Sequence, residues 1–130
     1  MRAFLDSNIL IYAFSDDPRS ERARQLLVGG IVGIQSLNEF ANVALKRLGL
    51  NWDEVDFALD RILRLCELDG PIDLEIHRTA MLVARRYKLA VYDALILAAA
   101  LRASCDRLWS EDMHDGLLVE GQVTVSNPFR

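Results

Sequence analysis

Five acidic residues stand where predicted strands end or predicted helices begin: Asp6, Glu39, Asp93, Asp112 and Asp115. Two carboxylates about 4 Å apart repel each other by about 4 kcal/mol at an effective dielectric constant near 20, so several together need a compensating cation. Oxygen ligands suit Mg²⁺ or Mn²⁺, which keep several waters and take only one or two carboxylates directly. A metal-activated water can hydrolyse a phosphodiester, so this set of residues predicts metal-dependent phosphodiester cleavage.

Two neutral polar residues accompany these acids. Asn8 lies in the stretch "FLDSNILIYAF", two positions after Asp6, and its amide can donate a hydrogen bond to a ligand carboxylate. Ser110, two positions before Asp112, offers a hydroxyl to a bound water or a phosphate. Both are predicted to support the acids rather than to bind the metal.

Each acid also has a purely structural interpretation. Asp6 can cap the helix that begins near Asn8. Glu39 completes a capping-box pattern with Ser36, in which its carboxylate reaches back to the start of the helix. Asp93 can complement the dipole of its helix from the first turn.

Asp112 and Asp115 can be ordinary loop acids near Gly116. These alternatives stay open for each residue taken alone. A shared site is favoured because all five acids follow strands or open helices, and such sites form outside the carboxyl ends of parallel strands, at a topological switch point.

The elements that must position these acids form an alternating pattern. Short apolar strands are predicted at 2–5, 31–35, 106–110 and 122–126, with a further short segment around Ile72. Helices are predicted between them, including one from Ser36 to about residue 48, one capped by Asn51 and one from Asp73 to about Lys88. The segment 91–104 is apolar nearly all round, so it is expected to be a buried helix. The predicted fold class is α/β with a mainly parallel sheet of four to five short strands.

Composition sets broad limits on the class of protein. A chain of 130 residues with 52% hydrophobic residues is predicted to form one folded domain over 1–130. No apolar run reaches the roughly 18 residues of a membrane span. Cys66 and Cys105 are expected to be free buried thiols, as in a cytoplasmic protein, and His77 and His114 lack zinc-site spacing with them.

Four stretches carry a resemblance to a known family. "FLDSNILIYAF" around Asp6, "SLNEF" around Glu39, "VYDALILAAAL" around Asp93 and "LWSEDMHDG" around Asp112 resemble, in order, the motifs of PIN-domain ribonucleases of the VapC type, which are toxins of toxin–antitoxin pairs. The resemblance runs along nearly the whole chain and implies a three-layer α/β/α fold.

The resemblance also implies an activity and partners. It implies Mg²⁺- or Mn²⁺-dependent endonuclease cleavage of RNA, homodimerisation, and neutralisation by a VapB-type antitoxin whose C-terminal segment lies across or near the site. By motif match, Asp6, Glu39, Asp93 and Asp112 become the acidic metal-binding set, and Asp115 matches a less regular fifth position.

The net charge of −4 is compatible with an RNA substrate. Removing the five candidate acids from 19 leaves 14 acidic residues against 15 basic ones, of which 13 are arginine. Guanidinium groups bind phosphates and stack on unpaired bases, although surface salt bridges and genome base composition also explain an excess of arginine. Arg85, Arg86 and Lys88, just before Asp93, are the predicted RNA-binding run.

Three other classes of protein remain as alternatives. A haloacid-dehalogenase-type phosphatase needs a second Asp where this chain has Asn8. A response-regulator receiver needs a late Lys after a strand, whereas Lys46 and Lys88 lie inside predicted helices. The non-enzymatic alternative is a PIN-like module that binds RNA or protein without cutting it.

Overall fold

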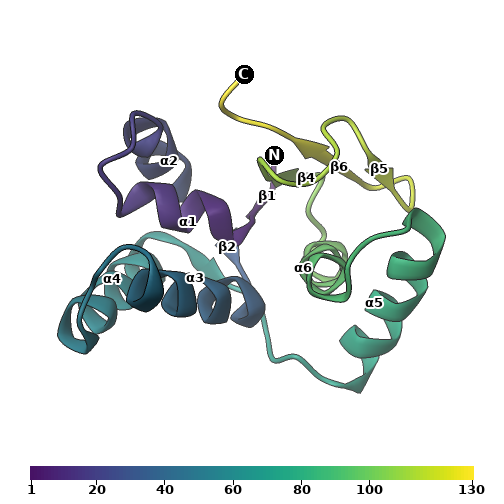
Figure 1. Ribbon diagram of the computed structural model, residues 1–130. Coiled ribbons are helices and arrows are strands. Elements are labelled where there is room, and N and C mark those ends of the chain that lie inside the picture. The colour runs from purple at the N-terminus through teal and green to yellow at the C-terminus, as the bar shows by residue number, and fades with distance from the viewer.

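A single mixed sheet forms the centre of the molecule in the computed structural model, which describes all 130 residues (Figure 1). Its strand order is β3-β2-β1-β4-β6-β5, and every neighbouring pair is parallel except β5 with β6. The strands are β1 (Ala3–Leu5), β2 (Ile31–Val32), β3 (Glu67–Leu68), β4 (Arg107–Trp109), β5 (Leu118–Val119) and β6 (Val123–Ser126).

Six helices cover both faces of this sheet. They are α1 (Ser7–Ala13), α2 (Ser20–Leu27), α3 (Ile34–Lys46), α4 (Trp52–Leu65), α5 (Leu74–Tyr87) and α6 (Val91–Arg102). Residues of α1 to α4 build one core cluster, and residues of α5 and α6 build the other. Figure 1 shows these two groups of helices on opposite sides of the sheet. The predicted α/β class with three layers is therefore confirmed.

Alternation along the central strands explains how one sheet serves two cores. In β1, Phe4 belongs to the α5–α6 core and Leu5 to the α1–α4 core, because successive side chains of a strand point to opposite faces. In β2, Ile31 and Val32 divide in the same way. All four side chains are at most 3% exposed, so the strands that lead to the candidate acids are fixed from both sides.

Local capping sets the start of several helices. Asp6 caps α1 by accepting a hydrogen bond from the backbone N–H of Ser7. Asn51 caps α4 and Asp73 caps α5, as the sequence predicts, and Asn51 also forms a reciprocal capping box with Glu54. The short α1 begins directly after β1, so the residues at its start lie at the carboxyl edge of the sheet.

The structure differs from the expected element boundaries in three places. The sheet has six strands rather than four or five, because β3 and β5 have two residues each and are too short to produce an alternating pattern. The Ile72 segment is not a strand. The predicted strand 31–35 ends at Val32, and α3 begins at Ile34 instead of Ser36.

The second half of the chain contains the helix that is buried most completely. Helix α6 buries Ala94 and the continuous stretch from Ile96 to Ala100. Both cysteines are free and buried, as expected, and burial raises the pKa of each thiol to about 11. No helix combines the length and apolar character that crossing a bilayer requires.

Candidate active site

The carboxyl ends of β1 and β4 form a topological switch point. From β1 the sheet continues to β2 and β3 on one side and to β4, β6 and β5 on the other. Asp6 follows β1 and Ser110 follows β4, and the backbone N–H of Asp6 donates to the Trp109 carbonyl at 3.0 Å. The open end between adjacent parallel strands at such a point is where α/β sheets bind ligands. Asp6 and Ser110 therefore lie at the edge of the sheet where the sequence places the candidate site.

Asp6 is a buried carboxylate that only neutral donors contact. Its Oδ1 accepts from the Ser7 backbone N–H at 2.7 Å, and its Oδ2 accepts from Ser110 Oγ at 2.6 Å and from Asn8 Nδ2 at 3.2 Å. Asp6 is 3% exposed. Asp6 thus caps α1 through Oδ1 and binds Ser110 and Asn8 through Oδ2. Capping alone does not explain the contacts of Oδ2.

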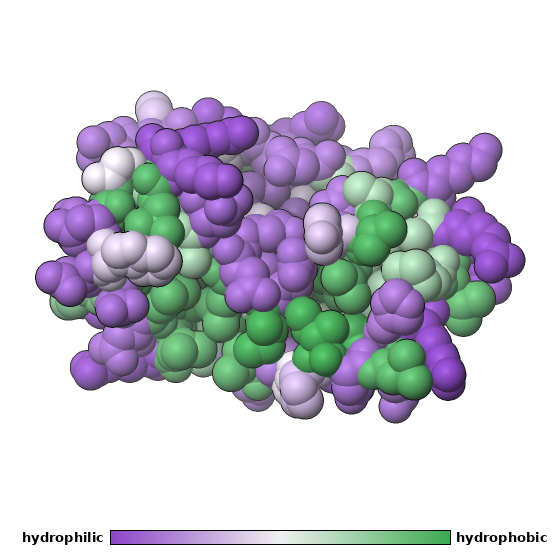
Figure 2. Space-filling model, turned by 60° about the horizontal axis from the view of Figure 1, so that its bottom comes forward, coloured by the Kyte–Doolittle hydropathy of each residue, from purple (hydrophilic) through white to green (hydrophobic).

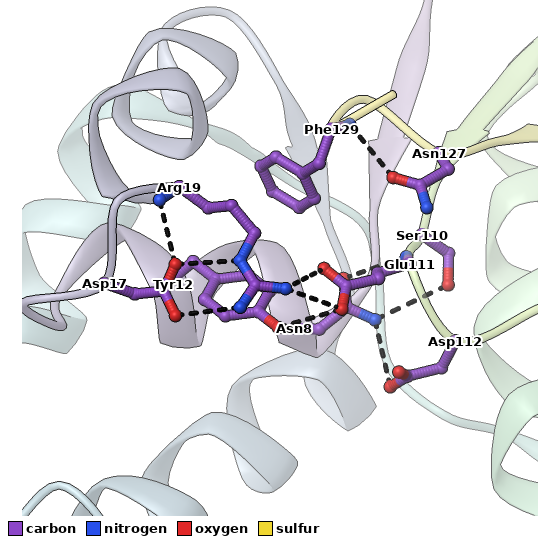
Figure 3. A network of polar contacts seen from close by, with 9 residues as sticks. All are labelled: Asn8, Tyr12, Asp17, Arg19, Ser110, Glu111, Asp112, Asn127 and Phe129. Atoms are coloured by element: carbon purple, nitrogen blue, oxygen red, sulfur yellow. Dashed lines mark hydrogen bonds and ion pairs between the residues drawn. The ribbon is translucent and has the colours of Figure 1, made fainter.

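Asn8 joins the first strand end to the loop after β4. Its Nδ2 donates to Asp112 Oδ2 at 3.2 Å as well as to Asp6, and its Oδ1 accepts from the Glu111 backbone N–H at 3.3 Å (Figure 3). Ser110 Oγ lies 3.5 Å from the same amide nitrogen. Of the two polar residues that the sequence predicts to support the acids, Asn8 contacts both Asp6 and Asp112, and Ser110 contacts Asp6.

Glu39, on α3, lies at the same carboxyl edge of the sheet. We call this edge the rim, and Asp6, Glu39, Asp93 and Asp112 the rim acids. Its Oε1 accepts from Ser7 Oγ at 2.7 Å, and its Oε2 accepts from Gln35 Nε2 at 3.0 Å. The capping-box interpretation of Glu39 is wrong: α3 begins two residues before Ser36, and the Ser36 hydroxyl donates to the Leu5 carbonyl at 3.1 Å. The carboxylate is therefore directed towards α1 and not to the backbone of its own first turn.

Asp93 lies in the first turn of α6, on the other side of the sheet from Glu39. Burial raises the pKa of the Asp93 carboxyl, and the negative charges of Glu39 and Asp112 raise it further. Asp93 therefore lies within electrostatic range of Glu39 on α3 and of Asp112 in the loop after β4. Asp93 still lies where it complements the helix dipole, so that interpretation and a role in the site are compatible.

The electrostatics of Asp6 indicate a shared negative field. Burial raises the pKa of Asp6 to about 6, and the charges of Asp93 and Glu39 add to this effect. The hydrogen bonds from Ser110 and the Ser7 backbone oppose it without reversing it. Because the acids disfavour one another's ionisation, a cation among them stabilises the fully ionised state.

No basic residue neutralises these acids. The ion pairs of the chain involve Asp17, Glu67, Asp69 and other acids, but not one of the four acids at this rim. The donors that touch the rim acids are hydroxyl, amide and backbone groups, which carry no charge. No ion pair within the chain therefore balances the charge of these four carboxyl groups.

The donor set suits a hydrated divalent ion. No three Asp, Glu, His or Cys side chains come close enough to form a preformed metal cage. Mg²⁺ and Mn²⁺ fit such a rim, because they keep several waters and need only one or two direct carboxylates, while the remaining acids can accept hydrogen bonds from those waters. The oxygen-only chemistry of the four acids excludes the thiolate and imidazole ligands typical of structural zinc.

Comparison with known proteins identifies the family. The family model described as "PIN domain" matches residues 3–114, which include all four rim acids. The chain belongs to the PIN-domain family. A search of curated proteins finds no match.

Solved structures with the same fold come from several bacteria. A toxin–antitoxin complex from Klebsiella pneumoniae is 23% identical to this PIN domain with a TM-score of 0.73, covering 97% of both chains. VapC20 of Mycobacterium tuberculosis, described as a sarcin–ricin loop cleaving toxin, is 15% identical with a TM-score of 0.70, covering 85% of this chain and 89% of its own. VapBC2 of Rickettsia felis, bound to a promoter DNA fragment, is 16% identical with a TM-score of 0.72 and covers 98% of each chain. At these identities the likeness shows the fold.

Asp115, the fifth candidate acid, has other partners in this PIN domain. Its Oδ1 accepts from the Asn127 backbone N–H at 2.9 Å, and its Oδ2 lies 3.5 Å from Arg130 Nη1. No contact joins it to the rim acids. The structure therefore gives Asp115 a role in holding the C-terminal segment, and its proximity to Asp112 in sequence is misleading because the loop turns between them.

Of the predicted RNA-binding residues Arg85, Arg86 and Lys88, one forms an ion pair with an acid of this chain. Arg86 donates to both carboxylate oxygens of Glu120, at 2.7 and 2.6 Å. Lys88 ends α5 in the left-handed conformation, and Arg85 is exposed without an ion pair. Nothing in the structure directs these three side chains towards the acids.

Sequence reasoning missed a second network that supports the loop after β4. Arg19 Nη1 donates to both oxygens of Glu111, at 3.0 and 3.1 Å, while its other nitrogens bind Asp17 (Figure 3). The Tyr12 hydroxyl donates to Glu111 at 3.0 Å, and the Arg19 guanidinium lies 4.4 Å from the Tyr12 ring centre. Since Arg19 and Glu111 are far apart in sequence, no spacing could have predicted their pairing.

Ser7 and Gln35 were also missed, although both bind Glu39. The sequence did hold a clue to Ser7, because Ser7 lies between Asp6 and Asn8, which were both predicted site residues.

The open groove at this rim has a volume of about 500 Å³, and its walls include Ser7, Glu39 and Asp112. Glu39 and Asp112, which line this groove, are therefore open to solvent.

Proposed function

We propose that this protein is a metal-dependent endoribonuclease and the toxin of a VapBC-type toxin–antitoxin pair. One observation carries the proposal: Asp6, Glu39, Asp93 and Asp112 come from four separate segments to one rim of the sheet, and no basic residue of the chain neutralises them. A group of carboxylates without basic partners suits a cation, and a cation beside an open groove suits a phosphodiester substrate.

The four acids would hold Mg²⁺ or Mn²⁺, directly or through water. Nucleases with PIN domains generally use divalent metals. When bound, the ion supplies charge stabilisation for the phosphate and makes water a better nucleophile. Asn8 and Ser110 hold Asp6, Asn8 also holds Asp112, and Ser7 holds Glu39.

The toxin–antitoxin part of the proposal is supported by fold neighbours and by the surface. Two of the similar structures are toxin–antitoxin complexes, one from Klebsiella pneumoniae and one, VapBC2, from Rickettsia felis. Several large apolar side chains are exposed, including Trp52 and Phe57 on α4 and Leu74, Val91 and Tyr92 on α5 and α6. Exposed apolar groups that cluster mark interaction surfaces. Figure 2 shows hydrophobic residues gathered on both sides of a hydrophilic middle on one face.

We assign these surfaces to two partners, a VapB-type antitoxin and a second copy of this chain. One groove between α1, α2 and α4 has a volume of about 550 Å³, and its mixed lining includes the apolar Phe14 and Phe57 beside the charged Arg24 and Arg61. It is large enough to receive apolar side chains of a bound peptide. We further propose that residues 1–130 form a single PIN domain, since both core clusters pack on one sheet.

The test uses purified protein free of any antitoxin. With a mixture of cellular RNA and Mg²⁺ or Mn²⁺, we expect discrete cuts, and we expect EDTA to stop them. Restoring excess Mn²⁺ to the EDTA-treated sample should restore cutting, which excludes a contaminating metal-independent nuclease. Activity that survives EDTA contradicts the metal-dependent mechanism. Binding of RNA without cutting under every metal condition favours a non-cleaving PIN-like module instead.

A further inference from the structure

Helix α3 and its C-cap residue place one acidic and one basic side chain along the same groove. Glu39 and Arg47 both line the groove of about 500 Å³ at the carboxyl edge of the sheet. They are eight residues apart, which corresponds to about 12 Å along a helix. Glu39 lies at the end near Asp6, and Arg47 is the residue that ends the helix. The groove therefore runs from the rim acids to a single cation.

Arg47 is the only basic residue that lines this groove, and it is exposed. It takes part in none of the ion pairs of the chain. By contrast, Arg19, Arg86 and Arg102 are all bound to carboxylates. A guanidinium that shares a groove with carboxylates but pairs with none of them keeps its donors available for an anion.

The remaining lining of the groove is suited to a nucleotide. Asn42, on the same helix between Glu39 and Arg47, supplies an amide that can both donate and accept. Ile11 and Leu48 add apolar surface. Cation, amide and apolar wall are the three kinds of contact that a phosphate, a base edge and a base face require.

We propose that the Arg47 end of the groove is a subsite for one unpaired nucleotide next to the bond that is cut. The Arg47 guanidinium binds the backbone phosphate of this nucleotide, and Asn42 contacts its base or sugar. This inference rests on the proposed function, because it takes RNA as the substrate. It replaces the run Arg85–Lys88 as the principal phosphate contact, since that run does not line the groove.

A general electrostatic effect of the helix end is the rival explanation. A cation in the last turn complements the dipole of a helix and attracts any anion weakly. Lys46 shares this position on α3, is exposed and pairs with no acid, but it does not line the groove. Lys46→Ala therefore removes the same charge from the same helix end, and it serves as the matched control for Arg47→Ala.

The first measurement is RNA binding without cutting. A fluorescent single-stranded oligoribonucleotide is titrated with each variant in EDTA, and anisotropy gives the Kd at several salt concentrations. We expect Arg47→Ala to weaken binding about 10-fold, because a charge-assisted contact is lost. The slope of log Kd against log salt should fall by about 0.7, the value for one phosphate contact with a single strand. Lys46→Ala should stay within about 2-fold of wild type, and Arg47→Lys should recover part of the affinity.

The second measurement is cutting in Mn²⁺. Arg47→Ala should raise KM about 10-fold and change kcat by less than about 3-fold, because Arg47 binds substrate away from the reacting atoms. Circular dichroism melts check that each variant is folded. Equal losses in Arg47→Ala and Lys46→Ala, or no loss in either, overturn the subsite.

The two proposals fail in distinguishable ways. If the wild type cuts RNA and Arg47→Ala is unchanged in Kd and KM, the subsite is wrong and the nuclease stands. If the wild type binds RNA through Arg47 but cuts nothing, the phosphate contact of Arg47 stands, and both the nuclease and the position of the subsite next to a cut bond are wrong. If the wild type neither binds nor cuts single-stranded RNA, both are overturned.

Discussion

Two groups of acids in this PIN domain are built in opposite ways. Near the start of α5, Asp69 and Asp73 share Arg102, whose Nη2 lies 2.8 Å from Asp69 and whose Nη1 lies 3.4 Å from Asp73. At the carboxyl edge of the sheet, Asp6 and its neighbours are contacted only by neutral donors such as Ser110. Asp69 and Asp73 therefore have a positively charged partner within the chain, whereas the acids at the carboxyl edge have none.

The difference shows which acids are available for an external cation. Pairing with arginine favours the ionised form of a carboxyl, as it does for Asp17, whose pKa Arg19 lowers. Asp6 and Asp93 show the opposite shift, because burial and the charges of neighbouring acids raise the pKa of both carboxyls. The chain thus keeps a concentrated negative charge at the rim, although it has 13 arginines with which to neutralise it.

The largest expected effect comes from isosteric removal of one rim charge. Asp93→Asn should lower the rate of RNA cutting by about 10²–10³-fold, the usual consequence of removing one preorganised electrostatic group from a reaction site. Cleavage of a labelled RNA in Mn²⁺ measures the rate.

The matched control for this substitution is Asp73→Asn. Asp73 also lies at a helix start, where it accepts from the Ile76 backbone N–H, and asparagine caps helices equally well. We expect its cutting rate to stay within about 2-fold of wild type. Equal losses in the two variants would contradict the distinction between paired and unpaired acids.

The next effect is stabilisation by metal. A ligand that binds only the folded state at 100 times its Kd adds about 2.7 kcal/mol to the free energy of unfolding. Urea unfolding with and without Mn²⁺ should show this gain for the wild type and for Asp73→Asn. In Asp93→Asn the gain at the same Mn²⁺ concentration should be much smaller. If the stabilisation by Mn²⁺ persists in Asp93→Asn and is lost in Asp73→Asn, the metal binds at the arginine-paired acids and not at the rim acids.

A smaller effect is the pH dependence that Asp6 imposes on the metal-free protein. Its pKa rises from 3.8 to about 6 on folding, mainly through burial. Between these values the folded state holds a proton that the unfolded chain has released, so raising the pH through this window lowers the free energy of unfolding. Asp6→Asn removes this dependence.

The measurement is urea unfolding in EDTA at pH 4.5 and pH 7.5. The stability of Asp6→Asn relative to wild type should increase by about 2 kcal/mol between the two pH values. A relative stability that is constant with pH would mean that Asp6 is not held in a field that disfavours its charge.

The smallest expected effect distinguishes the two acids of the last loop. Asp115 binds the Asn127 backbone N–H and the exposed Arg130, so Asp115→Asn should leave RNA cutting within about 2-fold of wild type. Asp112→Asn should lower cutting substantially, because Asp112 lies at the rim beside Asn8. Equal losses of cutting rate in the two variants would mean that Asp115 belongs to the site after all.

The sequence predicted the parts of this fold that depend on local pattern. The caps at Asn51 and Asp73, the buried helix α6 and the strands that precede Asp6 and Ser110 all follow from residue type and spacing. It overestimated the second strand and missed β3, whose Glu67 and Leu68 are both exposed and carry no burial pattern.

For the candidate site, the sequence predicted the four acids and the neutral groups Asn8 and Ser110, but not Ser7 and Gln35, which bind Glu39. The bond between Ser7 and Glu39 depends on how α1 packs near α3. The role of Asp115 depends on the path of the C-terminal segment, and the position of Arg47 on the groove depends on where α3 ends. These are consequences of tertiary packing, which no local pattern in one sequence records.

A crystal grown with MnCl₂ and measured for anomalous scattering tests the central claim most directly. The account predicts a manganese peak among Asp6, Glu39, Asp93 and Asp112, with at least one carboxylate oxygen bound to it. A map with no peak at this rim, or with its strongest peak at Asp69 and Asp73 beside Arg102, would contradict it.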